Sequence, residues 1–230
     1  MLSSEKIADA ADAVKRIETE FVPAAFACSF GAEDMVLLDL IAAHARRIEV
    51  FTLDTGRLPA ETYTLMDEVR ERYSVPLRVY FPDTREVEAW VEQNGVNGFY
   101  RSAAQRKQCC HIRKVVPLGR ALAGKKAWVT GLRREQSVTR QTLQEREWDA
   151  SNQMFKFSPL LDWAEDEVWS YLRAHNVPYN ALHEKGYPSI GCAPCTRAIA
   201  PGEDVRAGRW WWEQPEGKEC GLHVDRNANT

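Results

Sequence analysis

Five of the six cysteines stand where thiols can do chemistry. The chain holds them as an adjacent pair, a C-x-x-C pair and a single residue near the end: Cys109 and Cys110, Cys192 and Cys195, and Cys220. Four thiolates in two pairs make a metal-ligand set. Adjacent side chains on a helix diverge by about 100°, which suits a larger iron–sulfur cube better than one ion. The pattern favours a 4Fe-4S cluster, with one zinc ion or unliganded core thiols as alternatives.

The two remaining cysteines differ in their surroundings. Cys28 lies inside an apolar run, so packing is its expected role. Cys220 lies in a polar segment with His223 close behind it and with Arg206 and Arg209 upstream. Positive neighbours favour the thiolate, which is the reactive form of cysteine. Cys220 is therefore a candidate nucleophile, and an accidental exposed thiol is the alternative.

The charge of the chain is unevenly spread. The net charge is −3, yet residues 101–140 hold eleven Lys or Arg against one acidic residue, Glu135. This basic window carries +10, so the rest of the chain carries −13. A local positive field concentrates an anionic ligand. The window lacks the interleaved aromatic residues of single-strand binders, so no nucleic-acid partner is expected. A solvated basic face is the alternative.

Composition limits the class of protein. The 230 residues are 44% hydrophobic and 27% charged, which are ordinary globular values and fit one domain with a modest appendage. No run approaches the ~18 apolar residues of a membrane span, and no apolar signal core begins the chain. No membrane partner and a cytoplasmic location are therefore expected. Because the cytosol keeps thiols reduced, six cysteines there indicate ligands or nucleophiles rather than disulfides.

Short apolar runs alternate with helical segments along the first half of the chain. An amphipathic helix is expected over the first twenty residues. Buried parallel strands are expected at 24–30, 48–54, 77–82 and 127–133. Helices are expected at about 33–45, 59–73, 85–94 and 108–123. This alternation predicts an α/β fold with a doubly wound, mostly parallel sheet.

The second half of the chain is less periodic. After Gln136 a polar stretch predicts a mobile loop, 155–161 a further strand, and 165–174 a helix. From residue 176 the chain is rich in Gly, Pro, Cys and Trp, which predicts an irregular C-terminal tail. We therefore divide the chain into a nucleotide-binding and cluster-bearing core, 1–175, and a segment of cluster ligands and catalytic tail, 176–230.

Two predicted strands end in residues that could bind a nucleotide, since ligands of open α/β sheets lie beyond the carboxyl ends of the strands. The first strand runs into a small turn before a helix, where backbone N–H groups can meet an anion. Its candidate residues are Ser29, Gly31 and Asp34. The second strand ends in a segment that could grip a nucleoside or form a capped turn: Leu53, Asp54, Thr55, Gly56 and Arg57.

Taken together, these motifs resemble a known enzyme family. The segments are SFGAED, LDTGR, CCHIRK, TGLRREQS, FSPLLDW, GCAPC, GRWWWE and KECGLH. They resemble the assimilatory adenylyl-sulfate (APS) reductases, relatives of the 3′-phosphoadenylyl-sulfate (PAPS) reductases, from about residue 24 to residue 223. The resemblance implies a fold of the adenine-nucleotide alpha-hydrolase (PP-loop) type. It also implies a pyrophosphate loop at 29–34 and adenosine held by 53–57.

The resemblance further implies roles for the basic residues and the thiols. Arg133 and its neighbours would form a basic substrate loop, and the phosphosulfate would be surrounded by Lys114, Arg206, Arg209 and His223. A 4Fe-4S cluster would be held by Cys109, Cys110, Cys192 and Cys195. The family reduces APS to sulfite and AMP with electrons from thioredoxin, and Cys220 would carry the S-sulfocysteine intermediate.

Spacing suggests what the cluster does. Lys114 follows Cys110 by four residues, one α-helical turn, so the cluster, this lysine and the substrate anion can be neighbours. We therefore expect the cluster to act structurally and electrostatically.

Three other interpretations of the protein's function remain open. They are PAPS or dual APS/PAPS reduction, a zinc-stapled nucleotide- or RNA-binding module, and an ATP-dependent sulfur transferase. The sequence also leaves a homo-oligomer open.

Overall fold

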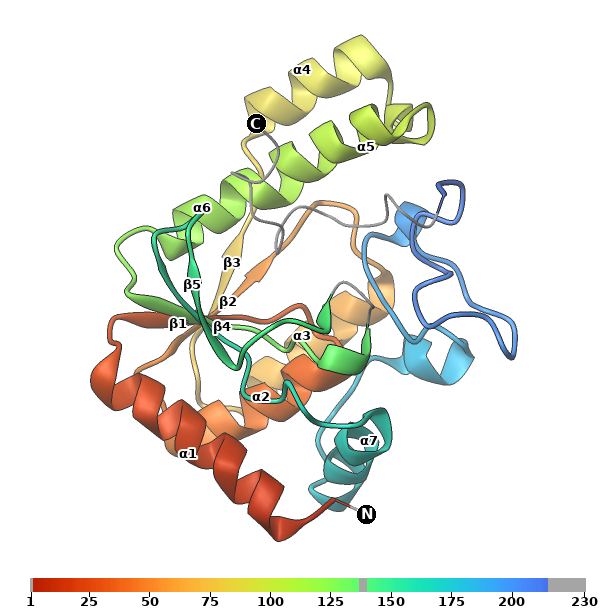
Figure 1. Cartoon of the computed structure of the whole chain (residues 1–230). Coiled ribbons are helices and arrows are strands. Elements are labelled where there is room, and N and C mark those ends of the chain that lie inside the picture. Colours follow the sequence, from red (N-terminus) through yellow and green to blue (C-terminus); the bar gives the residue numbers. More distant parts are fainter. Residues whose placement is uncertain (1, 137–139, 215–230) are drawn as a thin grey trace.

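A computed structural model describes residues 2–136 and 140–214, built around one six-stranded sheet (Figure 1). Its strands are β1 (Ala24–Ala27), β2 (Glu49–Leu53), β3 (Leu77–Tyr80), β4 (Ala127–Val129), β5 (Arg146–Asp149) and β6 (Met154–Phe157). They lie in the order β3-β2-β1-β4-β6-β5, and every neighbouring pair is parallel except β5 with β6. The expected mostly parallel α/β sheet is confirmed.

Helices connect the strands and flank the sheet. They are α1 (Ser4–Glu20), α2 (Ala32–His44), α3 (Ala60–Arg72), α4 (Thr84–Asn94), α5 (Ala103–Cys110), α6 (Val116–Leu122) and α7 (Glu165–Ala174). A π-helical turn, η2 (His111–Val115), separates α5 from α6, and short 3-10 turns include η1 (Gly98–Tyr100), η3 (Arg134–Gln136), η5 (Ala181–Lys185) and η6 (Ala193–Cys195). Side-chain caps mark three of the described α-helix starts: Ser3 before α1, Asp83 before α4 and Ser102 before α5. No described helix has the length and hydropathy needed to cross a membrane.

The two faces of the sheet carry separate cores because successive strand residues point to opposite sides. Phe26 of β1 belongs to the larger core, with α1, α2, α3 and α7. Its neighbour Ala25 belongs to the smaller core, with α6 and Trp128. Helix α2 packs between α1 and α7, so nine of its thirteen residues are buried. This explains why its sequence is apolar almost all round.

Two predictions need correction. The helix expected at 108–123 begins earlier, at Ala103, where Ser102 caps it, and the π turn interrupts it. The loop expected after Gln136 contains strand β5, which pairs antiparallel with β6 at the edge of the sheet. An edge strand has one neighbour, and its Trp148 side chain stays 53% exposed. The buried apolar run that marks an inner strand is therefore missing here.

The sheet order defines where a ligand can bind. The chain leaves β1 for β2 on one side and returns to β4 on the other, so β1 and β4 flank a topological switch point. In open α/β sheets the crevice beyond the carboxyl ends at that point is the ligand site. The described part of the segment after α7, 176–214, supplies residues to the same edge (blue in Figure 1). The division of the chain at residue 175 stays a prediction.

Candidate active site

The carboxyl ends of β1, β2 and β4 open into one cavity of about 250 Å³, here called the strand-end cavity. Nine of the predicted substrate residues line it: Ser29, Gly31, Asp34, Leu53, Thr55, Lys114, Arg133, Arg206 and Arg209. Asp54, Gly56 and Arg57 are not among its lining residues. His223 and the candidate nucleophile Cys220 lie outside the described residues. The structure therefore gathers residues from five separate stretches of sequence at one place.

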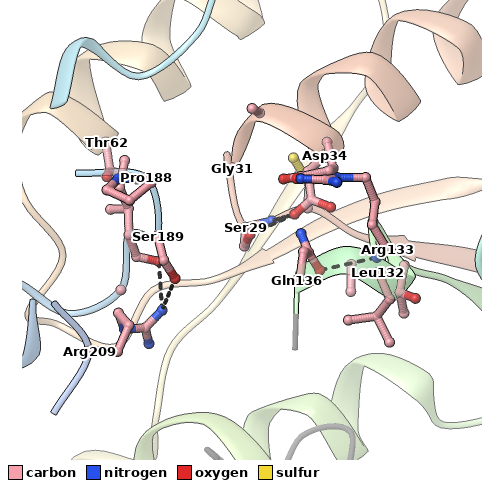
Figure 2. Close-up of a pocket in the computed structure, with 18 of the residues that line it drawn as sticks. Ser29, Gly31, Asp34, Thr62, Leu132, Arg133, Gln136, Pro188, Ser189 and Arg209 are labelled. Carbon is pink, nitrogen blue, oxygen red and sulfur yellow. Dashed lines mark hydrogen bonds and ion pairs between the residues drawn. The ribbon is translucent and has the colours of Figure 1, made fainter. Parts of the chain in front are cut away.

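The turn after β1 is held by a buried carboxylate. The backbone N–H and the hydroxyl of Ser29 both donate to Oδ2 of Asp34, each at 2.6 Å (Figure 2). Burial raises the pKa of Asp34 to about 6, although the two Ser29 hydrogen bonds pull it downward. A Cβ on Gly131 would stand 2.2 Å from Oδ1 of Asp34, so only glycine permits this approach. Asp34 thus ties the loop after β1 to the loop after β4.

Helix α2 begins at this turn and points its first residues into the cavity. Gly31 precedes the helix and has no side chain that could cap the first N–H groups, which suits an anion there. Glu33 in the first turn pairs with Arg133, with Nε and Oε1 2.8 Å apart. Arg133 is buried, and Glu135 approaches it at 3.2 Å as well. Two carboxylates therefore balance the charge of this arginine.

Across the cavity, the segment after α7 contributes further cations. Arg209 donates to the hydroxyl of Ser189 at 3.3 Å and to the carbonyl of Ile190 at 3.2 Å (Figure 2). Any side chain at Gly191 would collide with the Arg209 guanidinium, 2.4 Å from the Cβ position. Among the described residues, five cationic ones line the cavity against three acidic ones. This excess favours an anionic ligand.

The four paired cysteines line a second, smaller cavity, here called the cysteine cavity. They come from the end of α5 and from η6 with the residue just before it, and all four are buried free thiols: Cys109, Cys110, Cys192 and Cys195. Four cations line the same cavity: Arg57, Arg106, Arg113 and Lys114. None of the described lining residues is acidic. Within the described ranges, no three His, Cys, Asp or Glu side chains are arranged to hold one metal ion.

Burial and the cations act in opposite directions on the thiols. Burial, together with the neighbouring Cys192, raises the pKa of Cys195 to about 12. Burial would also raise the pKa of Cys192, but Lys114 and a contact of 3.2 Å with the Thr55 hydroxyl lower it below its ordinary value. Burial raises the pKa of Cys109 although Arg113 opposes it. Crowded buried thiols with cations around them fit an iron–sulfur group, whose four thiolates carry negative charge.

The segment 53–57 divides between the two cavities. Leu53 and Thr55 line the strand-end cavity, whereas Arg57 lines the cysteine cavity and donates to the Val96 carbonyl at 2.6 Å. Asp54 accepts from the backbone N–H of Gly56 at 2.7 Å and from the Tyr63 hydroxyl at 2.9 Å. Gly56 has a φ of +70°, which glycine adopts without strain. Asp54 and Gly56 therefore shape the turn that separates Thr55 from Arg57.

Lys114 is the one described residue that lines both cavities. It lies in the π turn η2, not in the regular α-helix expected from the sequence. Single π turns inside helices are frequent at functional sites. Whatever binds in either cavity therefore faces the same ammonium group.

Sequence reasoning passed over several charged residues of the site, among them Arg106, Arg113 and Glu213. Arg106 and Arg113 stand three and four residues from Cys109, on the same helical face, which is a usable signal. Glu213 offers no such signal because its partner, Arg106, lies 107 residues away. The basic window is thus partly internal, with Arg106, Arg133 and Arg140 buried.

The sheet order and the turn after β1 are those of an α/β fold of the PP-loop type. Candida glabrata FMN adenylyltransferase, in complex with FAD and pyrophosphate, has the same fold, with a TM-score of 0.54 at 18% identity over 95% of this chain and 80% of that chain. The chain belongs to the phosphoadenosine phosphosulfate reductase domain family, whose model matches residues 23–198.

Relatives within the family are close in sequence. The adenosine 5′-phosphosulfate reductase of Allochromatium vinosum is 59% identical over 198 residues, which cover 86% of this chain and 77% of the relative. The enzyme of that name from Neisseria meningitidis serogroup A is 48% identical over 96% of this chain and 91% of its own. A crystal structure of phosphoadenylyl-sulfate reductase from Candida auris, a phosphate complex, has a TM-score of 0.71 at 26% identity, covering 86% and 98%.

Proposed function

We propose that this protein reduces APS to sulfite and AMP, the assimilatory reaction. One observation carries the proposal: a cation-lined cavity at the switch point adjoins a cavity of four cysteines, and Lys114 lines both. APS is a nucleotide with two adjacent anionic groups, so it matches a strand-end site with excess positive charge. The names of the two bacterial relatives support this substrate.

The substrate contacts follow from the lining of the strand-end cavity. Leu53 and Thr55 would contact adenosine, while the turn 29–34 and the start of α2 would receive the phosphate. Lys114, Arg206 and Arg209 would surround the phosphosulfate, with His223 joining them from outside the described residues. Fixed cations near the sulfur lower the repulsion between an anionic substrate and an attacking thiolate.

The chemical step is proposed at Cys220. Its thiolate attacks the sulfur of APS, an S–S bond forms, the S–O bond to the phosphate breaks, and AMP leaves with that electron pair. Lys114 and Arg209 would stabilise the charge that develops on the leaving phosphate. The product on the enzyme is S-sulfocysteine at Cys220.

A dithiol such as thioredoxin would complete the cycle. One of its thiolates attacks the Cys220 sulfur, the S–S bond breaks, and sulfite leaves with the electron pair. The second thiol closes the disulfide of the reductant and frees Cys220, so the reductant supplies both electrons. Such a reaction suits the cytoplasm, where dithiols are kept reduced.

The cysteine cavity would hold a 4Fe-4S cluster through Cys109, Cys110, Cys192 and Cys195. Its donor set and surrounding cations fit that group, and the bound cluster would supply a fixed negative charge beside Lys114. Arg57 and Arg113 would balance this charge without reaching the strand-end cavity. Lys114 would then be oriented between the cysteines and the substrate anion.

The direct test is incubation with APS in the absence of reductant, followed by intact mass measurement. The chain should gain one SO3, located at Cys220 by peptide mapping. Cys220→Ser should gain nothing while keeping its iron and its affinity for AMP. If Cys220→Ser still forms sulfite at the wild-type rate, the proposed nucleophile is wrong.

PAPS is the second candidate substrate, because the solved relative from Candida auris is a PAPS reductase. The two nucleotides differ only by a 3′-phosphate. Side-by-side kinetics with APS and PAPS should give the larger kcat/KM with APS. The reverse order would assign the chain to PAPS reduction.

A further inference from the structure

A buried ion pair joins the cysteine-bearing helix to the end of the described chain. Nε and Nη2 of Arg106, in α5, donate to the two carboxylate oxygens of Glu213 at 2.9 and 2.7 Å. The side chains are only 0% and 7% exposed. Burying two charges costs desolvation free energy. The best-attested role of such pairs is to specify one arrangement of the parts that they join. The pair therefore holds Glu213 in one place relative to α5.

The same arginine also holds the residues just before Glu213. Its guanidinium lies over the ring of Trp210, 4.5 Å from the centroid, and Trp210 is 1% exposed. The backbone N–H of Trp210 donates to the Cys195 carbonyl at 3.1 Å, and that of Glu213 donates to the Trp210 carbonyl at 2.8 Å. Arg106, Trp210 and Glu213 thus lock the turn 210–213 onto the wall of the cysteine cavity.

The substrate-side arginine of this segment has its own anchors. Arg209 is held by Ser189 and Ile190, and residues 196 and 209 are joined by a backbone bridge. Neither Arg106 nor Glu213 lines the strand-end cavity. Loss of the Arg106–Glu213 pair should therefore alter where the chain goes after residue 213 more than it alters nucleotide binding.

Cys220 follows Glu213 by seven residues, which span at most about 25 Å. On the basis of the function proposed above, we propose that Arg106 and Glu213 are positioning residues that fix the origin of the segment carrying Cys220. They set the rate of S-sulfonation without touching the substrate. The pair acts through geometry, because a nucleophile is productive only when it is held near the reacting atom.

The test compares three rates of Cys220 sulfonation in a single turnover with APS and no reductant. Glu213→Gln keeps the shape of the side chain but removes its charge, and its sulfonation rate should fall at least about tenfold. Its AMP affinity and iron content should stay within about twofold of wild type, because Glu213 itself lines neither cavity. Glu213→Asp keeps the charge on a shorter side chain and should give an intermediate rate.

The matched control is an exposed pair in the same part of the chain. Arg197 donates to both carboxylate oxygens of Glu203 at 2.8 Å, but these side chains are 38% and 34% exposed. Glu203→Gln should sulfonate within about twofold of the wild-type rate, since exposed pairs contribute little.

Three outcomes decide the proposal. A tenfold loss in Glu213→Gln with unchanged AMP affinity and iron supports it. A merely structural pair would lower the melting temperature and leave the rate of the folded variants unchanged, and a wild-type rate in Glu213→Gln or in the well-folded Glu213→Asp overturns it. If the wild-type chain gains no SO3, the proposed function fails first and this inference fails with it.

Discussion

The strand-end cavity and the cysteine cavity are neighbours that balance charge in opposite ways. In the strand-end cavity the buried Arg133 faces two carboxylates, and Asp34 accepts two hydrogen bonds from Ser29. In the cysteine cavity no described lining residue is acidic, and Arg57 and Arg113 donate to backbone carbonyls, which are neutral. Carboxylates thus balance Arg133 in the first cavity and Arg106 in the second, whereas Arg57 and Arg113 keep their positive charge beside the thiols.

This difference fits the proposed assignment of a substrate that comes and goes to the first cavity and a resident cluster to the second. A substrate site must remain folded between turnovers, so its polar groups need partners inside the protein. A site for a resident metal group can depend on that group, because binding free energy is then also folding free energy.

The largest effect is expected from removing one cysteine ligand. Cys195→Ser should lose most of the about four iron and four sulfide per chain and should unfold at a lower temperature, because the proposed cluster would stabilise this region. Metal analysis and thermal denaturation measure both changes. Cys28→Ala, a buried thiol outside the cysteine cavity, is the control and should keep its iron. Full iron content in Cys195→Ser, or one zinc ion per wild-type chain, would contradict the cluster.

An intermediate effect is expected at Arg57, because its substitution distinguishes most directly between the roles of the two cavities. Arg57→Ala should release iron to a chelator about tenfold faster, because residues around metal ligands tune metal affinity. The KM for APS should change by less than about twofold, since Arg57 does not line the strand-end cavity. Arg101→Ala, an exposed arginine nearby, should change neither quantity. A large rise in KM with an unchanged rate of iron release would show that Arg57 contributes to the adenosine site, as expected from the sequence.

The smallest effect is a pH dependence at Asp34. Its pKa is raised to about 6 from an ordinary value of 3.8, mainly by burial, so between these values the folded state binds a proton that the unfolded chain releases. The stability of wild type relative to Asp34→Asn should therefore fall by about 1.4 kcal/mol per pH unit in this window and level off above it.

Urea denaturation of wild type and Asp34→Asn over this pH range measures the difference in unfolding free energy. Asp9→Asn, on the exposed side of α1, controls for the loss of one carboxylate. A difference between wild type and Asp34→Asn that rises with pH would mean that Asp34 is charged in the folded state throughout the window.

Local sequence predicted most of the sheet and its helices. The inner strands are short apolar runs because both of their faces are covered, and α7 begins and ends where its apolar spacing predicts, at Glu165 and Ala174. Strand β5 was not predicted, because this polar edge strand is stabilised by pairing with β6. Its own residues carry no signal of that contact. The π turn at 111–115 was not predicted for a similar reason, since its residues have the pattern of an ordinary α-helix.

The site divides in the same way. The amino-acid sequence by itself determined which chemistry is present: two cysteine pairs, a basic window and polar residues after two strands. Only the tertiary structure decided which cavity each residue faces. Thr55 and Arg57 line different cavities, and Lys114 lines both. Arg106 pairs with Glu213. The physical reason is that residue type and local spacing are properties of short segments, whereas burial and charge balance arise between segments distant in sequence.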